Sequence, residues 1–144
     1  MSENYLVDGP IPTSFIASYI EAFAFRTDAG GHSFFIGQVR ADILDNKKVI
    51  AIEYSAYESM VEAEADNIKS RVLSEFNDVK SITIIHSKGL VKAGEVSLAV
   101  MVSAGHRQQA IQACSLAVEM IKKNLPVWKK EIYEDDSYSW KENK

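Results

Sequence analysis

Apolar residues recur at two different spacings along this chain, and segments of the two kinds alternate. A spacing of three and four residues, typical of one face of a helix, occurs in residues 12–25, 58–77 and 106–124. Runs rich in β-branched and aromatic residues separate these segments and follow the last one, and such runs favour strands. The strands are expected in residues 32–43, 47–57, 79–89, 95–105 and 127–140. The expected order is therefore helix, two strands, helix, two strands, helix, strand.

The ends and buried faces of the first and last helices follow from the same pattern. Thr13 or Ser14 is expected to cap the first helix, because a hydroxyl side chain can accept a hydrogen bond from a free N–H group at a helix start. Its apolar stripe is expected to consist of Phe15, Ile16, Tyr19, Ile20 and Phe23. The last helix is expected to bury Ala110, Ala113, Cys114, Ala117 and Ile121. Pro126 should end this helix, because proline cannot continue it.

Short connections between successive strands indicate how those strands pair. The turn-forming stretch "LDNKK" at residues 44–48 predicts that the strands on either side of it form an antiparallel pair. Parallel crossovers need a dozen or more residues, and the chain has no G-x-G-x-x-G motif. We therefore expect an α+β fold in which a mostly antiparallel sheet packs with helices. The tail at residues 127–140 is expected to add an edge strand and a turn.

Composition narrows the class of protein. The chain has 144 residues and 47% hydrophobic residues, which favours one globular domain spanning residues 1–144. The formal charge of -4 argues against broad nucleic-acid binding. One cysteine allows no internal disulfide, and no Cys/His cluster has the spacing of a zinc site. The start "MSENYLVDGPIP" lacks a signal-peptide pattern, so we expect a cytoplasmic protein that acts on a small ligand.

Two groups of basic residues stand at the ends of predicted elements. Arg40 follows the apolar run "FFIGQV", where a solvated surface arginine is the alternative to a binding residue. His106 and Arg107 begin the last helix, where the free N–H groups favour an anion and a cation opposes the helix dipole. An anionic ligand would explain this pair, and a plain surface pair is the alternative. We predict that these residues converge on one cleft with a third basic group.

The third group lies around the end of the last helix. Lys122 and Lys123 suit a helix C-terminus, and that favourable placement is the alternative to a binding role. Lys129 and Lys130 should face opposite sides of the final strand, which Trp128 is expected to anchor. A lysine packed near other cations would have a lowered pKa and could act as a nucleophile or proton shuttle. His32 and His86 are predicted to be structural.

Several of these stretches, taken together, resemble a known family. The segments "FFIGQVR", "YSAYESM", "IIHSKG" followed by "AGE", "SAGHRQQAIQAC" and "IKKNLPVWKKE" run in the order and spacing of the large, catalytic subunit of molybdopterin synthase. The similarity covers nearly the whole chain. Its most specific part combines the H-R pair with the later pattern K-x-x-x-P-x-W-K-[KR]-E.

The resemblance implies an α/β-hammerhead fold and a sulfurtransferase of molybdenum cofactor biosynthesis. In that family, cyclic pyranopterin monophosphate receives two sulfurs and becomes the dithiolene molybdopterin. The sulfur arrives as a thiocarboxylate on the Gly-Gly C-terminus of a small ubiquitin-like subunit. A homodimer of large subunits is implied at the centre of a heterotetramer. The resemblance implies no cofactor and no metal, and neither a nucleic acid nor a membrane as partner.

Site residues follow from the resemblance position by position. Lys122 and Lys129 match the catalytic lysines, and Glu131 is expected to orient Lys129. The substrate-binding positions correspond to Gln38, Val39, Arg40, His106, Arg107, Lys122, Lys129, Lys130 and Glu131. The family commonly has H-R-x-G where this chain has "HSKG", so Lys88 is a candidate replacement for that arginine. Lys144 corresponds to a C-terminal basic residue donated across the dimer.

Two other functions remain open at this point. A non-catalytic subunit of the same fold would bind an anion or a ubiquitin-like protein, and it would be expected to lack at least one of Arg40, Arg107, Lys122 and Lys129, all of which are present. A generic anion-sensing oligomeric domain would explain the basic residues, although it gives no reason for the spacing of "PVWKKE".

Overall fold

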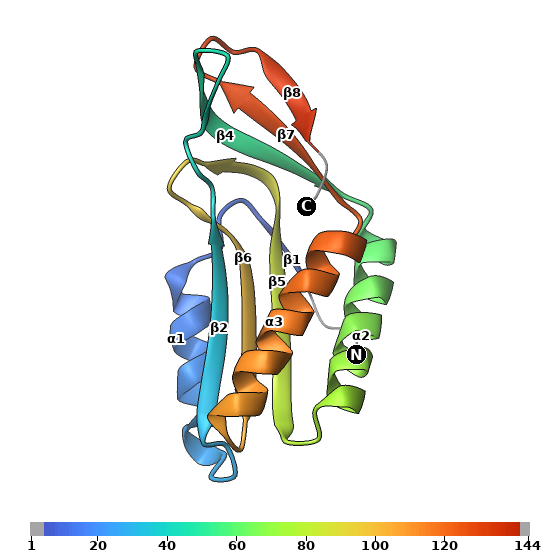
Figure 1. Cartoon of the computed structure of the whole chain (residues 1–144). Coiled ribbons are helices and arrows are strands. Elements are labelled where there is room, and N and C mark those ends of the chain that lie inside the picture. Colours follow the sequence, from blue (N-terminus) through green and yellow to red (C-terminus); the bar gives the residue numbers. More distant parts are fainter. Residues whose placement is uncertain (1–4, 142–144) are drawn as a thin grey trace.

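The computed structural model describes residues 5–141, which form three α-helices, a short 3-10 helix and eight strands (Figure 1). The helices are α1 (Thr13–Ala22), the 3-10 helix η1 (Phe23–Phe25), α2 (Glu58–Glu75) and α3 (Arg107–Asn124). The strands are β1 (Leu6–Asp8), β2 (Gly31–Gln38), β3 (Ile43–Leu44), β4 (Lys47–Ala56), β5 (Val79–Lys92), β6 (Val96–Ala104), β7 (Val127–Tyr133) and β8 (Tyr138–Lys141). No helix within this part of the chain is both long and apolar enough to cross a membrane.

The strands form one sheet with the order β2-β6-β5-β4-β7-β8. In addition, β1 pairs with β5 and β3 pairs with β4. The β1–β5 pairing is parallel, and all the others are antiparallel. The predicted α+β class with a mostly antiparallel sheet is confirmed.

Strand β5 joins two parts of the molecule. Its residues 79–86 pair with β6, whereas its residues 89–92 pair with β4. Gly89 lies where the pairing changes and has a φ of +85°, a conformation that residues with a side chain rarely adopt. We call β2, β6, residues 79–86 of β5 and the helices the body, and β3, β4, β7 and β8 the arm, which projects from one end of the body (Figure 1).

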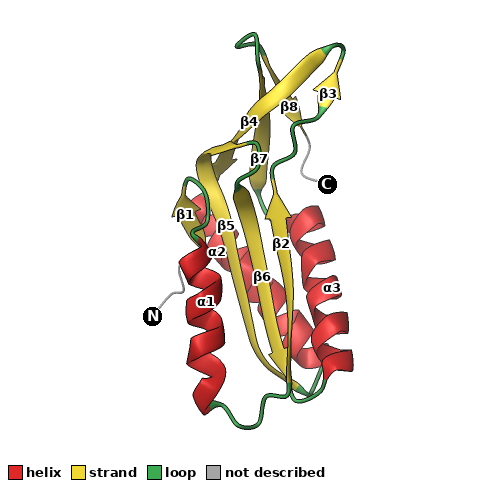
Figure 2. Ribbon diagram, turned by 90° about the vertical axis from the view of Figure 1, so that its left-hand side faces the viewer, coloured by secondary structure: helices red, strands yellow, loops and turns green. Residues whose placement is uncertain are grey.

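Helices cover both faces of the body, α1 on one face and α2 with α3 on the other (Figure 2). Alternate residues of β6 enter two different cores because successive side chains of a strand point to opposite faces. Val100 and Val102 pack with α2 and α3, whereas Ala99 and Met101 pack with α1. The predicted face of α3 is confirmed, since Ala110, Ala113, Cys114, Ala117 and Ile121 are all buried.

The predicted pairing of the first two long strands is wrong. β2 pairs with β6, and β4 pairs with β5 and β7. The turn chemistry at residues 44–48 instead forms a small hairpin between β3 and β4. Asp45 and Asn46 both have positive φ there, at 52° and 63°, as a two-residue hairpin turn of the primed type requires. A local turn signal therefore identified a hairpin but not the partner of β2.

Four smaller predictions are also wrong. The N-cap of α1 is Pro12 and no side chain caps this helix, while Phe15 and Ile20 on the expected stripe are exposed. β7 is not an edge strand, because β8 pairs with its outer side. Trp128 is 50% exposed, so it does not anchor β7 in a core.

Candidate functional site

A cavity of about 740 Å³ opens where the arm meets the body. Its walls come from the end of β2 and the following loop, from β4, β5 and β6, from the last turn of α3, and from β7 and β8. The lining residues include Phe35, Gln38, Val39, Arg40, Ile52, Tyr54, His86, Ser97, Ile121, Lys122, Lys129, Glu131, Trp140 and Lys141. Most of the residues predicted for the site therefore line one cavity, although they come from three separate stretches of the sequence.

Among residues 5–141, four arginine and lysine side chains line this cavity, Lys141 of β8 and three residues of the predicted site. Arg40 follows β2, Lys122 stands in the last turn of α3, and Lys129 lies on β7. Burial lowers the pKa of the Lys129 ammonium, and the positive charges of Lys122 and Arg40 lower it further, while the Glu131 carboxylate opposes the shift. The predicted lowering of a lysine pKa is confirmed in direction. The arrangement provides a lysine that gives up its proton more readily than an ordinary one.

The guanidinium of Arg40 remains at the rim of the cavity. Its side chain is 83% exposed, and its Nη2 lies 3.4 Å from Oδ2 of Asp42. An exposed ion pair of this kind contributes little stability, because water screens it. Arg40 is therefore available to a ligand that enters the cavity.

Glu131 lies two residues beyond Lys129 on the same side of β7 and also lines the cavity. This residue is buried, with 7% of its surface exposed. Nζ of Lys141 is 3.5 Å from its Oε1, but that oxygen accepts no hydrogen bond from the described residues. A buried carboxylate with spare acceptor capacity beside Lys129 has the position needed to orient an ammonium group.

Lys130 lies on the opposite face of β7, so the predicted alternation of the two lysines is confirmed. Its Nζ is 3.0 Å from Oε1 of Glu53 and 4.8 Å from the ring centre of Tyr138. The ring of Trp140 is also within cation–π range, at 5.7 Å. Lys130 does not line the cavity and has its own partners on the arm.

His106 and Arg107 do not join the other cations within one chain, so their predicted convergence is wrong for a single copy. They stand at the start of α3, and Lys122 stands near its end; a helix of 18 residues spans about 27 Å. Oδ2 of Asp78 accepts hydrogen bonds from the backbone N–H of His106 at 2.8 Å and from its ring Nδ1 at 3.1 Å. A carboxylate of this chain therefore stands beside the cationic helix start.

The contact with His106 also changes the pKa of Asp78. The hydrogen bonds and charge of His106 lower the pKa of the Asp78 carboxyl below its ordinary value. The side chain of His106 is nevertheless 88% exposed. Arg107 is exposed as well, so both residues are open to a second molecule.

Three buried polar residues of the cavity wall were not predicted as site residues: Tyr54, His86 and Ser97. The strand expected over residues 79–89 continues to Lys92 as β5, and His86 lies within it. It follows Ile82 and Ile84 on the face that α2 and α3 cover, and it lies where that face reaches the cavity. Polar residues at the inward positions of apolar strands were the available signal.

His86 is held in its uncharged form. Burial lowers its pKa from 6.5 to about 4, and the charges of Lys129 and Lys122 act in the same direction. Its Nδ1 is 2.7 Å from the carbonyl oxygen of Ser87.

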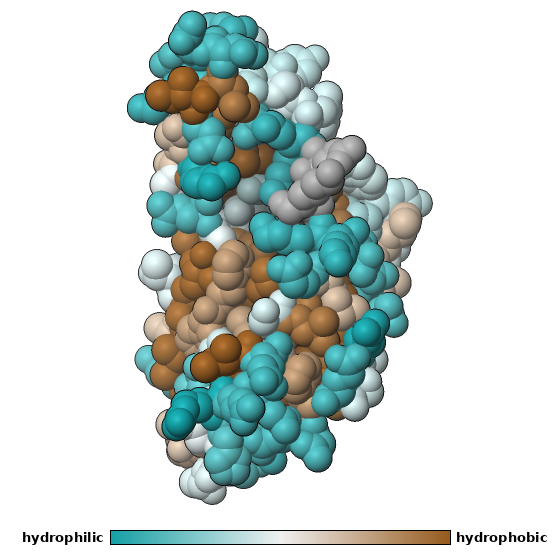
Figure 3. Space-filling view, viewed as in Figure 1, coloured by the Kyte–Doolittle hydropathy of each residue, from teal (hydrophilic) through white to brown (hydrophobic). Residues whose placement is uncertain are grey.

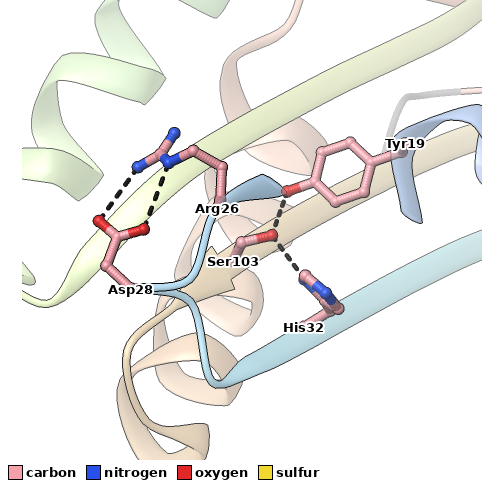
Figure 4. Close-up of polar contacts among 5 residues, drawn as sticks. All are labelled: Tyr19, Arg26, Asp28, His32 and Ser103. Atoms are coloured by element: carbon pink, nitrogen blue, oxygen red, sulfur yellow. Dashed lines mark hydrogen bonds and ion pairs between the residues drawn. The ribbon is translucent and has the colours of Figure 1, made fainter. Parts of the chain in front are cut away.

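His32 lies in a different place, on the body beside α1. Figure 4 shows the hydroxyl of Ser103 bonded both to Tyr19 and to Nδ1 of His32, the latter at 2.7 Å. The rings of Tyr19, Phe23 and Phe34 surround the imidazole. The predicted structural role of His32 is consistent with these contacts.

Lys88 lies away from the cavity. Nζ of Lys88 is 3.0 Å from Oε1 of Glu58 and 3.7 Å from Oδ1 of Asp8, so its position does not match that of a cavity residue. Lys144 lies outside the described residues. Residues 5–141 contain no group of three or more His, Cys, Asp or Glu side chains that could hold a metal ion.

Comparison with known proteins gives consistent results. Residues 11–124 match the family model described as "MoaE protein". The chain is 44% identical over 115 residues to the molybdopterin synthase catalytic subunit of Taeniopygia guttata, covering 80% of this chain and 73% of that one. It is also 44% identical over 116 residues to the protein of the same name from Drosophila willistoni. That match covers 80% of this chain but 31% of the relative, so the chain spans about a third of the length of that Drosophila protein.

Solved structures share the fold. Molybdopterin synthase from Staphylococcus aureus superposes with a TM-score of 0.85 at 29% identity, covering 98% of both chains. A complex of subunits 1 and 2 of molybdopterin-converting factor from Helicobacter pylori gives a TM-score of 0.79 at 20% identity, covering 94% of this chain and 87% of the other.

Proposed function

Because the chain belongs to the MoaE protein family, we propose that it is the catalytic subunit of a molybdopterin synthase. It transfers sulfur from the thiocarboxylated C-terminus of a small ubiquitin-like subunit to cyclic pyranopterin monophosphate. Two transfers give the dithiolene of molybdopterin, a step of molybdenum cofactor biosynthesis. Residues 1–144 form one domain, which acts in the cytoplasm.

The observation that carries this proposal is the convergence of Arg40, Lys122 and Lys129 on one cavity. The reaction brings together two anions, a cyclic phosphate and a thiocarboxylate, and their mutual repulsion must be offset by fixed cations. The cavity volume of about 740 Å³ lies in the range of small-molecule sites. Gln38 and Val39 form the part of the wall next to Arg40.

Each lysine has a distinct part in the proposal. Lys129 has a lowered pKa, so it can exchange a proton with the reacting atoms or attack as a neutral amine. Lys122 binds the anionic groups, and its positive charge lowers the pKa of Lys129. Glu131 orients Lys129, and Lys130 supports β7 from the opposite face through Glu53.

The sulfur comes from the partner and not from this chain. Cys114, the one cysteine of the sequence, is buried in α3, and burial raises the pKa of its thiol. A protonated, buried thiol is a poor nucleophile. The Helicobacter pylori structure is described as a complex of two subunits, which supports a small subunit as partner for this fold. In the proposed assembly its Gly-Gly tail enters the cavity.

A homodimer completes the proposed site. β2 is the edge strand of the body, and Phe34, Phe35 and Ile36 on it are only half-buried. Figure 3 shows apolar side chains gathered over β2 and the adjoining part of α3. This exposed apolar edge supports a second copy as the partner of β2.

An antiparallel pairing of β2 with its symmetry mate also accounts for His106 and Arg107. In the proposed register the two-fold axis passes the middle of β2, between Phe34 and Phe35, which sets Gly31 of one copy opposite Gln38 of the other. Gly31 lies against Arg107, and Gln38 lines the cavity. The proposed dimer therefore brings His106 and Arg107 of one copy to the cavity of the other, where they bind the anionic substrate. With a small subunit at each outer end, the assembly is a heterotetramer.

The test is molybdopterin formation from cyclic pyranopterin monophosphate with this protein and a thiocarboxylated small subunit. The wild type should form product, and Lys122→Ala and Lys129→Ala should each lose most of it. Lys123→Ala is the matched control, because Lys123 ends the same helix but is exposed and does not line the cavity. Stable binding of the small subunit without product would instead favour a non-catalytic binding subunit. No binding at all would overturn both.

A further inference from the structure

Three uncharged polar side chains lie in the deep part of the cavity beside the Glu131 carboxylate, and cations stand at its rim. Tyr54, His86 and Ser97 line it and are 5%, 4% and 6% exposed, so they form its deep part. Arg40 and Lys141, which also line it, are exposed. The Tyr54 hydroxyl donates a hydrogen bond to Ser97 Oγ at 3.0 Å, and burial raises the pKa of this tyrosine, which keeps it protonated. The proposed reaction gives a role to the cations and to Glu131, but it gives none to Tyr54, His86 and Ser97.

The contacts of His86 determine which of its ring nitrogens carries the proton. Nδ1 lies 2.7 Å from the carbonyl oxygen of Ser87, which can only accept, so Nδ1 carries the hydrogen. An imidazole with a pKa of about 4 is neutral near pH 7, and therefore Nε2 bears a lone pair. His86 thus offers a hydrogen-bond acceptor and no second donor.

The position of the ring directs this acceptor toward the cavity. Nδ1 is turned back to the adjacent backbone, and the Tyr54 ring packs edge-on against the imidazole with a centroid distance of 5.1 Å. The outer edge of the ring, which holds Nε2, is then the part left to meet a ligand. Among residues 5–141 no group donates a hydrogen bond to Nε2. Nε2 is not among the fully buried side-chain atoms without a hydrogen-bond partner in this part of the chain, which are Ser87 Oγ and Glu131 Oε1, so this nitrogen is accessible from the cavity that His86 lines, where a ligand can supply a donor.

We propose that His86 is a further substrate-binding residue, whose Nε2 accepts a hydrogen bond from an N–H or O–H group on the uncharged ring portion of the substrate. This inference rests on the proposed function and adds an orientation to it. The anionic group lies toward Arg40 and the lysines, and the neutral hydrogen-bonding ring lies toward His86 and Tyr54. The lone pair of Nε2 would repel an anionic oxygen, whereas it accepts a hydrogen bond from an N–H or O–H group. This difference favours the stated orientation over the reverse one.

The direct test is ¹⁵N NMR of the full chain labelled at its three histidines, His32, His86 and His106. One ring should show the Nδ1–H tautomer, and its Nε2 resonance should move in the direction of an accepted hydrogen bond when cyclic pyranopterin monophosphate is added. Calorimetry on the same samples reports whether the compound binds. Binding with an unchanged Nε2 resonance overturns this inference alone, while no binding overturns the proposed function and this inference together.

A pair of variants separates the two ring nitrogens. In His86→Gln the amide oxygen reaches the place of Nε2, whereas in His86→Asn the amide group reaches only the place of Nδ1. We expect KM for the pyranopterin to rise about tenfold in His86→Asn with kcat little changed, and to stay near the wild-type value in His86→Gln. Thermal unfolding of both variants shows that each is folded. Equal effects of the two substitutions on KM would indicate a structural role and overturn the inference.

Discussion

The C-terminal end of α3 brings Lys122 to a cavity that Lys129 and Arg40 share, whereas its N-terminal end places His106 beside the carboxylate of Asp78. At the first end, burial and neighbouring positive charge lower the pKa of Lys129. At the second end, a carboxylate of the same chain pairs with the exposed histidine. Both ends are rich in basic residues, yet only the first concentrates charge against an enclosed space. The number of basic residues is therefore a poorer guide to a reactive side chain than its surroundings. Lys129 is partly buried beside other cations, whereas His106 is exposed and pairs with a carboxylate.

The largest effect is expected where the cavity lysine is replaced by a permanent cation. Lys129→Arg keeps the positive charge, but a guanidinium stays protonated and cannot exchange a proton near pH 7. If Lys129 transfers a proton or attacks as an amine, molybdopterin formation should fall by about 10²- to 10⁴-fold. Lys123→Arg, at the exposed end of α3, is the control. Activity retained in Lys129→Arg would mean that Lys129 acts only through its charge.

Acid should destabilise the cavity end of the molecule through His86. Its pKa is about 4 in the folded chain against an ordinary 6.5, so between these values the unfolded chain binds more protons than the folded one. The free energy of unfolding should therefore fall as pH falls through this window, by about 3 kcal/mol in all. Urea unfolding of the wild type and His86→Gln across the window isolates this contribution. A pH dependence shared equally by both proteins would show that His86 is not its source.

The sequence predicted the local features of both ends and missed how they are placed in space. The buried face of α3 and the alternation of Lys129 and Lys130 follow from periods of 3.6 and 2 residues, which depend on nearby residues only. The partner of β2 is β6, more distant in sequence, and the turn at Asp45 and Asn46 carries no information about it. Pairing across such separations depends on the packing of the whole sheet.

Two site errors have different causes. His106 and Lys122 lie on one helix, so the rise of about 1.5 Å per residue already placed them too far apart to share a cavity within one chain. That signal was present in the sequence. His86 was harder to recognise, because nothing in "IIHSKG" shows that the strand continues through Gly89 into the arm.

A mixing experiment tests whether the N-terminal end of α3 serves the cavity of another copy. Arg107→Ala should lower activity by roughly 10- to 100-fold, the loss expected when a charged hydrogen bond to an anionic substrate is removed. In a mixed dimer of Arg107→Ala and Lys129→Ala copies, one cavity keeps both residues. Unfolding and reassembling the two variants together should restore about a quarter of the wild-type activity, because half of the dimers are mixed and each has one intact site. No restoration would mean that Arg107 does not act across a dimer.

The smallest effect is expected from the pair that occupies the N-terminal end of α3. Asp78→Ala removes the acceptor for the His106 N–H and ring, so it should lower the free energy of unfolding slightly. The pKa of the Asp78 carboxyl is lowered in the folded protein, so its contribution is present above the ordinary aspartate pKa and is lost as pH falls through the folded value. Asp78→Asn keeps an oxygen acceptor without the charge, and it should retain more stability than Asp78→Ala while losing the acid dependence. If both substitutions also raise KM for the pyranopterin, Asp78 positions His106 for the substrate. If neither does, the carboxylate only stabilises the start of α3, and Arg107 is the residue from this end of the helix that binds the substrate.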